Sequence, residues 1–375
     1  MRFKTNHIIV LQLIALILAA ANGASAAEPS FTDVFVSGQD EYHTFRIPSI
    51  IVTKQGTLLA ICEGRKTGQG DHGDLDLVFK QSSDGGTTWS EMKTLYEEGG
   101  DATITIGNPC PVIDDTSGTI WMPFCRDNKE VLMTKSTDDG KTWSVPINIS
   151  EAVVKPAWSW VATGPGVGIQ LRRGEYKGRL VIPCDHGVPM EGRRVMFSHV
   201  FYSDDHGTTW QLGGRLDRHT DECQVVELAD GTLKMNARNY WGVHGGRPER
   251  DKMRVISYSR DGGDTWSDLE FDTTLVEPIC QASFFRYPES ETQVLFLNPA
   301  SKQARQRMTV RFSDDDGNTW PAGRVIHAGP AAYSCLAVLP DGSIACLFEG
   351  GANQAYEKLI FARFSLEWLK QGTDR

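Results

Sequence analysis

An eight-residue pattern that recurs five times constrains the fold of this chain more than any other feature. Each copy reads Ser-x-Asp-x-Gly-x-Thr-Trp, and the copies begin at Ser82, Ser136, Ser203, Ser259 and Ser313. Successive copies start 54, 67, 56 and 54 residues apart. The repetition indicates a structural period and not a catalytic motif, because an enzyme needs one site and the same residues recur in every unit.

The chemistry of each copy predicts a tight turn between two strands. Ser and Asp side chains can hydrogen-bond backbone groups of a turn, Gly tolerates positive φ, and Thr-Trp begins the next strand. Strand-like runs precede the copies, as in residues 76–80 and 253–258. A period of roughly 55 residues holding about four strands is the size of one propeller blade. We therefore interpret the repeated Asp residues as turn-stabilising, neither catalytic nor calcium-binding.

These units predict an all-β fold, a six-bladed β-propeller of four-stranded antiparallel sheets. Five blades carry the pattern. The sixth is expected between Tyr333 and Phe364, with the N-terminal strand closing it against the C-terminal one. Such closure removes exposed sheet edges. Helix is expected to be scarce, with residues 366–371 as its main candidate, and residues 27–375 are expected to form one domain.

The first 26 residues have the composition of a secretory signal peptide. Two cations precede an apolar run from Ile8 to Ala20, and small residues at 24–26 provide a cleavage site. We expect the mature chain to begin near Ala27 and to be secreted or periplasmic. The later sequence contains no apolar run of bilayer-spanning length, which predicts no stable membrane insertion.

The net charge of the chain limits the classes of partner that it can bind. The formal net charge is -10, and removing the two cations of the signal segment leaves -12. An acidic protein is a poor general binder of nucleic acid, so no nucleic acid partner is expected. An anionic substrate would have to be held by a local cluster of Arg. A monomer is expected.

Cysteine and histidine give no sign of a metal centre or a cofactor. The eight Cys show no CxxC or Cys/His ligand spacing, and the nine His show no HExxH motif. Most Cys lie in apolar, strand-like runs, which favours small buried hydrophobes, although an exported protein could pair some of them in disulfides. No metal and no cofactor are expected.

Several segments occur once and are candidates for chemistry. They are residues 45–48 (Phe-Arg-Ile-Pro), 63–65, 70–76, 221–226, 236–240, 302–308, 332–334 and 348–349. With the five repeats, their order along the chain resembles the sialidase (neuraminidase) superfamily, the bacterial type of exo-alpha-sialidase with Asp-box (BNR) repeats. The repeat alone occurs in other propellers, but the ordered set is specific. The resemblance covers essentially the whole mature chain.

The resemblance implies that three arginines bind the carboxylate of sialic acid. Arg46 and Arg238 match the first two, and Arg305 matches the third, with Arg307 as an alternative. The resemblance implies three further contacts around the substrate: Glu349 as the acid that holds Arg46, Arg65 as a sugar contact, and Asn108 as another.

The resemblance also implies the catalytic residues. Tyr333 corresponds to the nucleophile, Glu222 to its partner and Asp71 to the acid/base. Asp74 is an alternative acid, because the loop between Arg65 and Asp71 differs in length from that of some relatives.

This residue set is chemically consistent with a sialoside substrate. Three Arg can form charge-assisted, forked hydrogen bonds to one carboxylate. A neutral phenol avoids the repulsion that an attacking carboxylate would meet at a carbon that already bears a carboxylate. Phenol has a pKa near 10 and needs a base to accept its proton, a role that suits Glu222. Sialidases with a Tyr nucleophile are an exception to the two-carboxylate scheme of glycosidases.

The expected function is hydrolysis of terminal sialic acid from glycoproteins, glycolipids and oligosaccharides, with retention of configuration. Two alternatives remain open: a trans-sialidase or intramolecular trans-sialidase with the same core, and a non-catalytic propeller that binds sialoglycans. Trp158 and Trp160 either line the site or belong to the core.

Overall fold

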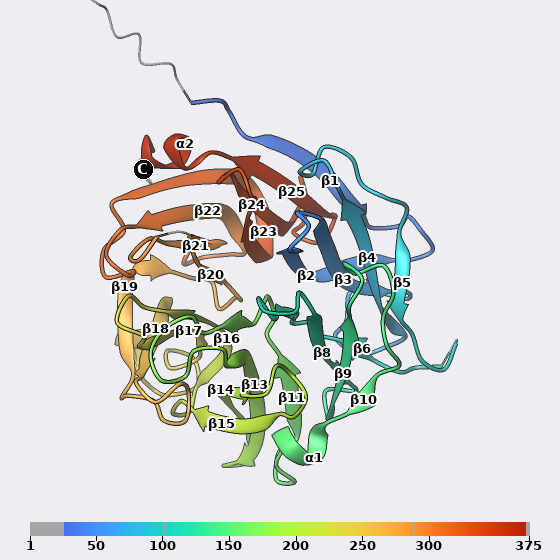
Figure 1. Cartoon of the computed structure of the whole chain (residues 1–375). Coiled ribbons are helices and arrows are strands. Elements are labelled where there is room, and N and C mark those ends of the chain that lie inside the picture. Colours follow the sequence, from blue (N-terminus) through green and yellow to red (C-terminus); the bar gives the residue numbers. More distant parts are fainter. Residues whose placement is uncertain (1–25, 101, 289, 373–375) are drawn as a thin grey trace, which may run out of the picture.

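The structure is a computed structural model that describes residues 26–100, 102–288 and 290–372. The predicted signal segment lies outside this range except for Ala26. The strands form sheets arranged around a common centre (Figure 1). The innermost strands, such as β2 (Thr44–Val52) and β16 (Thr220–Glu227), lie near the middle, and β5 (Lys93–Tyr96) lies at the periphery. The prediction of an all-β, propeller-like fold is confirmed.

Within the described part of the chain, the pairing gives two four-stranded sheets. The first has the order β2, β3 (Leu58–Arg65), β4 (Leu75–Ser82) and β5. The second has the order β16, β17 (Leu233–Asn239), β18 (Met253–Ser259) and β19 (Glu270–Val276). All of these pairs are antiparallel.

Two five-stranded sheets lie between them along the chain. One contains β6 (Ile106–Gly107), β7 (Val112–Ile113), β8 (Ile120–Arg126), β9 (Glu130–Ser136) and β10 (Ile147–Asn148). The other contains β11 (Trp160–Thr163), β12 (Ile169–Gln170), β13 (Leu180–Met190), β14 (Arg193–Ser203) and β15 (Gln211–Arg215). In each, two short strands share one side of the same long neighbour, because a loop divides the innermost strand.

The remaining strands form one seven-stranded sheet, so the pairing differs from the six separate four-stranded sheets predicted. Its order is β1 (Ser30–Val36), β25 (Lys358–Phe364), β24 (Ile344–Gly350), β23 (Ala322–Val338), β22 (Gln306–Ser313), β21 (Val294–Pro299) and β20 (Ser283–Arg286). The 17-residue strand β23 causes the merger, since its first part pairs with β22 and its second part with β24. The expected closure by the N-terminal strand is confirmed, because β1 pairs with β25.

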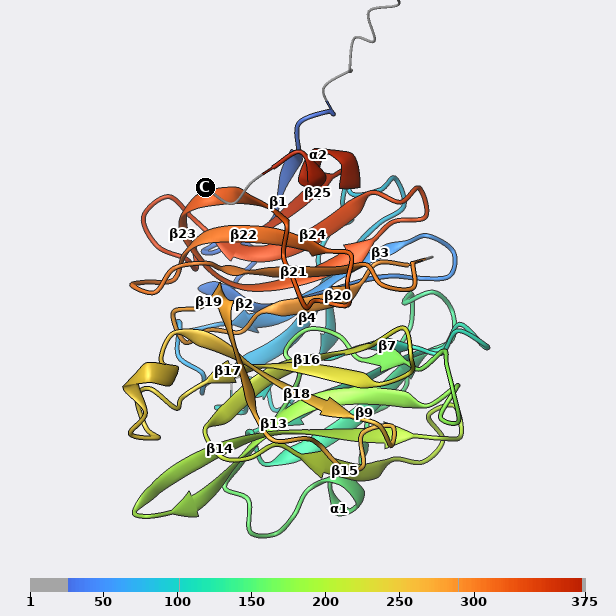
Figure 2. The same cartoon turned by 90° about the vertical axis from the view of Figure 1, so that its left-hand side faces the viewer.

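Helices in the described residues are short. They are α1 (Ser150–Val153), the 3-10 turn η1 (Pro248–Arg250) and α2 (Leu366–Lys370), the last at the predicted position. Viewed from the side, α2 lies beside the strands of the seven-stranded sheet (Figure 2). None of these helices has the length and apolar character needed to cross a membrane.

The repeated pattern forms the predicted turns. In the fourth copy, Ser259 accepts a hydrogen bond from the Gly263 amide at 2.8 Å and donates to Asp261 at 2.7 Å. Asp261 in turn accepts from the amide of Thr265 at 2.9 Å and from its hydroxyl at 2.5 Å. Bonds of the same kind recur in the other four copies. The interpretation of these Asp residues as turn-stabilising is confirmed.

The repeats also join neighbouring sheets. The ring of Trp89, which follows β4, lies 5.3 Å from that of Phe361 on β25, and Trp143 lies 6.5 Å from Phe79 on β4. Gly86 permits the first contact: its φ is +89°, and a Cβ atom there would lie 2.2 Å from the Phe361 ring. In these two copies the Trp therefore packs against the adjacent sheet.

All eight Cys are buried and unpaired, as small apolar side chains. A pair of buried His also supports the core. Nδ1 of His186 on β13 lies 3.0 Å from Nδ1 of His199 on β14, and the Trp158 ring stacks on His186 at 3.8 Å. Burial lowers the pKa of His186 to about 3 and that of His199 well below its usual range. Both rings are therefore neutral in the folded protein.

Substitution of Ser259 by Ala should destabilise the fold. The change leaves the buried Gly263 amide without its acceptor, at a cost of about 1–3 kcal/mol. Urea unfolding measures this loss, and the exposed Thr273→Ala on β19 serves as a control. Equal unfolding free energies for the two variants would contradict the assigned role of the turn.

The His pair should make stability fall on acidification. The pKa of His186 lies below its unfolded value of about 6.5, so the stabilisation is present above that pH and is lost as pH falls towards the folded value. The loss from His186 alone should be on the order of 2 kcal/mol at about pH 4.5. Urea unfolding at several pH values tests this, because His186→Phe with His199→Leu should flatten the dependence between about pH 6.5 and 4.5.

Candidate active site

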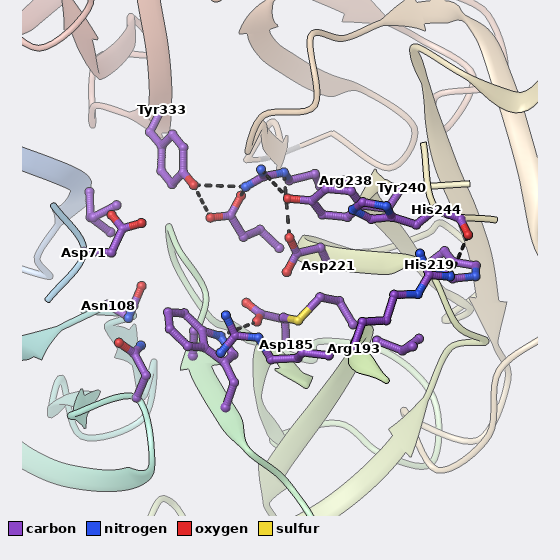
Figure 3. Close-up of a pocket in the computed structure, with 18 of the residues that line it drawn as sticks. Asp71, Asn108, Asp185, Arg193, His219, Asp221, Arg238, Tyr240, His244 and Tyr333 are labelled. Atoms are coloured by element: carbon purple, nitrogen blue, oxygen red, sulfur yellow. Dashed lines mark hydrogen bonds and ion pairs between the residues drawn. The ribbon is translucent and has the colours of Figure 1, made fainter. Parts of the chain in front are cut away.

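A cavity of about 380 Å³ opens where inner strands of several sheets converge. Charged and polar side chains line most of it, with a few apolar ones (Figure 3). Its lining residues are Ile47, Glu63, Arg65, Asp71, Asn108, Asn128, Trp160, Ala162, Asp185, Arg193, Arg194, Val195, Met196, His219, Asp221, Glu222, Arg238, Tyr240, His244 and Tyr333. The predicted nucleophile, its partner and the predicted acid/base all belong to this set.

Tyr333 on β23 and Glu222 on β16 meet in the cavity. The Tyr333 hydroxyl donates a hydrogen bond to Oε1 of Glu222, and Nη1 of Arg238 binds Oε2 of the same carboxylate at 2.7 Å. The same Nη1 lies 3.2 Å from the Tyr333 oxygen. The phenol thus has a proton acceptor and a cation at its oxygen, although 111 residues separate it from Glu222.

Burial raises the pKa of Tyr333 well above its ordinary value, and the charge of Glu222 raises it further. Arg238, Arg305 and Arg46 act in the opposite direction without reversing the shift. The phenol is therefore neutral before any reaction. Its proton can leave only together with attack, and Glu222 is in place to receive it.

Arg46 on β2 is fixed by Glu349 on β24. Nε and Nη2 of Arg46 bind the two oxygens of Glu349 at 3.0 and 3.3 Å, and Glu349 is fully buried. The same carboxylate accepts the amides of Ile47 and Tyr333, each at 3.0 Å. Glu349 therefore ties the first predicted arginine to the backbone of the predicted nucleophile.

Arg305, and not its alternative Arg307, joins this cluster. Its Nη1 donates to the Tyr356 hydroxyl at 2.9 Å and its Nη2 to the Ile279 carbonyl at 3.2 Å. The guanidinium carbons of Arg305 and Arg46 lie 5.5 and 5.0 Å from the centre of the Tyr333 ring. The structure thus brings Arg46, Arg238 and Arg305 together around one side chain.

Asp71 lines the same cavity and is paired with two arginines. Its Oδ1 is 3.0 Å from Nη1 of Arg65 and 3.3 Å from Nη1 of Arg46, and its side chain is 65% exposed. Burial acts to raise the pKa of this carboxyl, but the charges of Arg65 and Arg46 outweigh it and lower the pKa. Asp71 is therefore ionised in the free protein and occupies part of the space beside Arg46.

Arg65 is anchored behind Asp71 by Glu63. Both side chains are buried on β3, and Nη2 of Arg65 lies 2.6 Å from Oε2 of Glu63. Arg65 also binds the carbonyls of Gln69 and Gly70, which fixes the loop that carries Asp71. The other oxygen of Glu63 accepts the Asn108 amide at 2.9 Å.

Asp74, the alternative acid, does not line the cavity, whereas Asp71 does. The carboxylate of Asp74 pairs with Lys66 at 3.4 Å, and its side chain is only 12% exposed. The two predicted Trp separate as well. Trp160 lines the cavity, whereas Trp158 stacks on His186 beside the core.

Several cavity residues were not assigned from the sequence. Glu63 could have been found from its spacing of two from Arg65, because alternate strand residues share a face. Asp221 and Tyr240 stand in segments that the sequence singled out, but neither received a role, and Asp185 carried no such signal because acids in strands usually have structural roles. Tyr356, which binds Arg305, lies in a loop without any recognisable motif.

The arrangement suits an anion next to a nucleophile. Three guanidinium groups around one phenol leave hydrogen-bond donors that a carboxylate can take. No cluster of three or more His, Cys, Asp or Glu capable of holding a metal occurs among residues 26–100, 102–288 and 290–372.

Comparisons with known proteins agree with this geometry. The BNR repeat-like domain family matches residues 56–346. The chain is 32% identical over 94% of its length to the sialidase of Micromonospora viridifaciens, of which it spans 56%. It is 30% identical to the exo-alpha-sialidase of Aspergillus fumigatus, covering 88% of this chain and 86% of that protein.

A solved structure gives the same fold. The Hadza microbial sialidase Hz136 superimposes with a TM-score of 0.79 at 27% identity, covering 90% of this chain and 69% of that one. The family match extends over more than half of the chain, and three relatives reach 30% identity. The chain therefore belongs to the sialidase superfamily of glycoside hydrolases with BNR repeats.

Proposed function

We propose that the protein is an exo-alpha-sialidase that hydrolyses terminal sialic acid from glycoconjugates with retention of configuration. One observation carries the proposal: the Tyr333 hydroxyl is bound to Glu222 at the centre of Arg46, Arg238 and Arg305. A sialoside brings a carboxylate and an anomeric carbon to the same place. Its carboxylate would accept hydrogen bonds from the three arginines while its anomeric carbon faces the Tyr333 hydroxyl.

Substrate binding starts with a change of partners at Arg46. In the free protein Nη1 of Arg46 is paired with Asp71, while Nε and Nη2 remain on Glu349. The substrate carboxylate binds Nη1 of Arg46 in place of Asp71. Because Glu349 holds the other edge, Arg46 keeps its position during the exchange.

In the first chemical step, the Tyr333 oxygen bonds to the anomeric carbon as the bond to the leaving oxygen breaks. The phenolic proton passes to Glu222, and Asp71 in its acid form gives its proton to the leaving oxygen. The product is a covalent tyrosyl-sugar. Arg238 stabilises the Glu222 carboxylate before the proton arrives and the substrate carboxylate throughout.

In the second step, Asp71 accepts a proton from water, and the water oxygen bonds to the anomeric carbon. The bond to Tyr333 breaks, and Glu222 returns the proton to the phenolic oxygen. Two inversions at the same carbon give net retention. Free sialic acid then leaves, and Asp71 releases its proton to the solvent and returns to Arg46 and Arg65.

We also infer that the fold contains six blades. The seven-stranded sheet consists of two units of four strands that share β23: β20 to β23, and β23 to β25 with β1. Counted in this way, the five sheets become six blades. The last blade is closed by β1, the kind of closure that removes sheet edges.

Export and partners remain proposals from composition. The cationic and apolar start of the chain supports secretion or a periplasmic location. The acidic net charge argues against nucleic acid as a partner, whereas the local cluster of Arg46, Arg238 and Arg305 supports action on sialylated glycans. A monomer is proposed, with glycoproteins, glycolipids and oligosaccharides as substrates.

Replacement of Tyr333 by Phe should reduce kcat/KM by on the order of a thousandfold or more, because the nucleophile and its proton are lost together. Release of 4-methylumbelliferone from its sialoside measures the rate. Tyr258→Phe removes a hydroxyl of the same kind on β18 outside the cavity and should leave the rate unchanged. Equal rates for Tyr333→Phe and wild type would reject the nucleophile.

The product distinguishes the related activities. Proton NMR of the reaction should show free sialic acid appearing first as the α-anomer, since retention is expected. Formation of anhydro-sialic acid would instead indicate an intramolecular trans-sialidase. Transfer of sialic acid to added lactose, in place of its release, would indicate a trans-sialidase. Glycan binding without any release would leave only a binding function.

Binding of a sialic acid analogue should be accompanied by proton uptake. Arg65 and Arg46 lower the pKa of Asp71 in the free protein, and a bound carboxylate takes Arg46 and adds negative charge, so the pKa rises in the complex. At pH values between the pKa of Asp71 in the free protein and its pKa in the complex, the complex holds more protons than the free protein does. The affinity for the analogue therefore increases as pH falls through that range. Calorimetry at about pH 4 to 5 in buffers of different ionisation heat measures the uptake.

The matched variants for this experiment are Asp71→Asn and Asp74→Asn. The first should abolish the uptake, because the displaced carboxyl is gone. The second removes a carboxyl on the same loop that pairs with Lys66 outside the cavity, and it should bind with wild-type uptake. Undiminished uptake in Asp71→Asn would show that another group takes the proton.

A further inference from the structure

Two carboxyl groups that the proposed mechanism does not use lie beside Arg238. Asp185 on β13 and Asp221 on β16 belong to adjacent sheets, and their carboxyl groups point toward each other in the cavity wall (Figure 3). The exposed fraction is 1% for Asp185 and 6% for Asp221. A buried pair of this kind needs a compensating charge or a proton.

The hydrogen bonds of Asp185 identify the place for a proton. Its Oδ1 accepts the indole N–H of Trp160 at 3.0 Å, whereas its Oδ2 is buried without a hydrogen-bond partner among the described residues. Asp185 and Asp221 lie close enough for each carboxyl group to change the pKa of the other. A carboxyl oxygen that faces another carboxyl can be satisfied only if one of the two carries a proton.

The charge balance around the pair leads to the same result. Arg238 is the cation that contacts the group, with Nη1 on Glu222 at 2.7 Å and Nε 3.7 Å from Oδ2 of Asp221. Three carboxyl groups therefore share one guanidinium. Burial raises the pKa of Asp185 well above its usual range and that of Asp221 to about 7, with Asp221 and Glu222 adding to the first shift.

Arg193 and Arg194 on β14 also line the cavity, but neither forms an ion pair with Asp185 or Asp221 in the described part of the chain. Arg193 lies 4.0 Å from Glu191, and the guanidinium of Arg194 lies 4.7 Å from the centre of the Trp160 ring. Tyr240 binds Nη2 of Arg238 through its hydroxyl at 2.6 Å. The thiols of Cys125 on β8 and Cys223 on β16 lie close enough to feel the charge of Asp185, and burial raises the pKa of both, so they are neutral. Trp160 contributes only its N–H donor.

We propose that Asp185 and Asp221 form a proton-sharing pair that controls how tightly Arg238 holds the substrate carboxylate. Asp185 keeps its proton and donates to Asp221, while Asp221 gains and loses its own near neutral pH. The inference rests on the proposed function, because it assigns Arg238 to the substrate carboxylate. Asp185 and Asp221 are positioning residues, acting through Arg238 without contact to the reacting atoms.

The pair affects substrate binding through Nε of Arg238. This buried nitrogen has no hydrogen-bond partner in the described part of the chain, and Oδ2 of Asp221 lies 3.7 Å from it. When Asp221 ionises, its charge draws the guanidinium toward β16 and repels a carboxylate bound on the other side. Substrate affinity should therefore fall as pH rises through the ionisation of Asp221.

The test measures the Kd of 2-deoxy-2,3-didehydro-N-acetylneuraminic acid, an unsaturated sialic acid analogue, from about pH 5 to 9. All proteins carry Asp71→Asn, so that the carboxyl beside Arg46 does not titrate. The parent should bind with a Kd that increases up to about tenfold per pH unit above about pH 7. Adding Asp221→Asn should make the Kd change less than about twofold over the same range, because the titrating group is gone.

Two further variants separate the proton from the packing. Asp185→Asn keeps an acceptor for Trp160 and a donor for Asp221, so the midpoint of the pH dependence should stay near that of the parent. Asp185→Leu removes the donor and should move the midpoint to higher pH. Asp217→Asn, an exposed position before β16, is the control and should retain the parent dependence.

The outcomes are distinguishable. An unchanged pH dependence in Asp221→Asn, or equal midpoints for Asp185→Asn and Asp185→Leu, would overturn this inference while leaving the proposed function intact. No binding of the analogue at any pH would reject the proposed function itself. If a variant fails to fold, infrared difference spectra of the wild-type protein test the inference, because they detect protonated carboxyl groups. A carboxylic acid C=O band at neutral pH supports the protonated pair, and absence of this band overturns the inference.

Discussion

The burial of three guanidinium groups around one phenol is the interaction on which the rest of this structure depends. A buried cation without a partner is expensive, so each arginine is held on one edge: Arg46 by Glu349, Arg238 by Glu222, and Arg305 by Tyr356 and a backbone carbonyl. The opposite edges stay available for an anion. The excess of positive charge in the centre also explains why Asp71 turns inward in the free protein and pairs with Arg46 and Arg65.

The backbone reaches this arrangement through three β-bulges in inner strands. Two residues oppose one where Ile47-Pro48 faces Cys62, where Asp221-Glu222 faces Arg238, and where Ala332-Tyr333 faces Glu349. Successive side chains of a regular strand point to opposite faces, whereas a bulge re-aims one of them. The bulge in β16 allows both acids to contact Arg238, and the bulge in β23 brings the Tyr333 amide onto Glu349. Each of these three bulges contains or directly follows a residue of the proposed chemistry.

The repeated turns stabilise the fold, whereas segments that occur once form the site. The Ser-Asp-Gly-Thr turns fix the hairpins and join neighbouring sheets, as in the contact of Trp89 with Phe361. They keep the inner strands in place so that loops and bulges can differ from one sheet to the next. The long strand β23 shows how far such a difference extends, because it fuses two units and carries Tyr333 between them.

The sequence by itself determined the period, the turn chemistry, the closure of β1 on β25 and the side chains available for chemistry, because these depend on local spacing and residue type. It could also point to Arg46, Asp71, Glu222 and Tyr333, since each stands in a segment that occurs once. Only the tertiary structure placed Arg305 beside Tyr333 and left Asp74 outside the cavity, because both placements depend on which side chain reaches Tyr333 or the cavity. It also brought Asp185 opposite Asp221, a contact between adjacent sheets that no local pattern encodes. Charges separated by long stretches of chain acquire their protonation states only when folding removes water from between them.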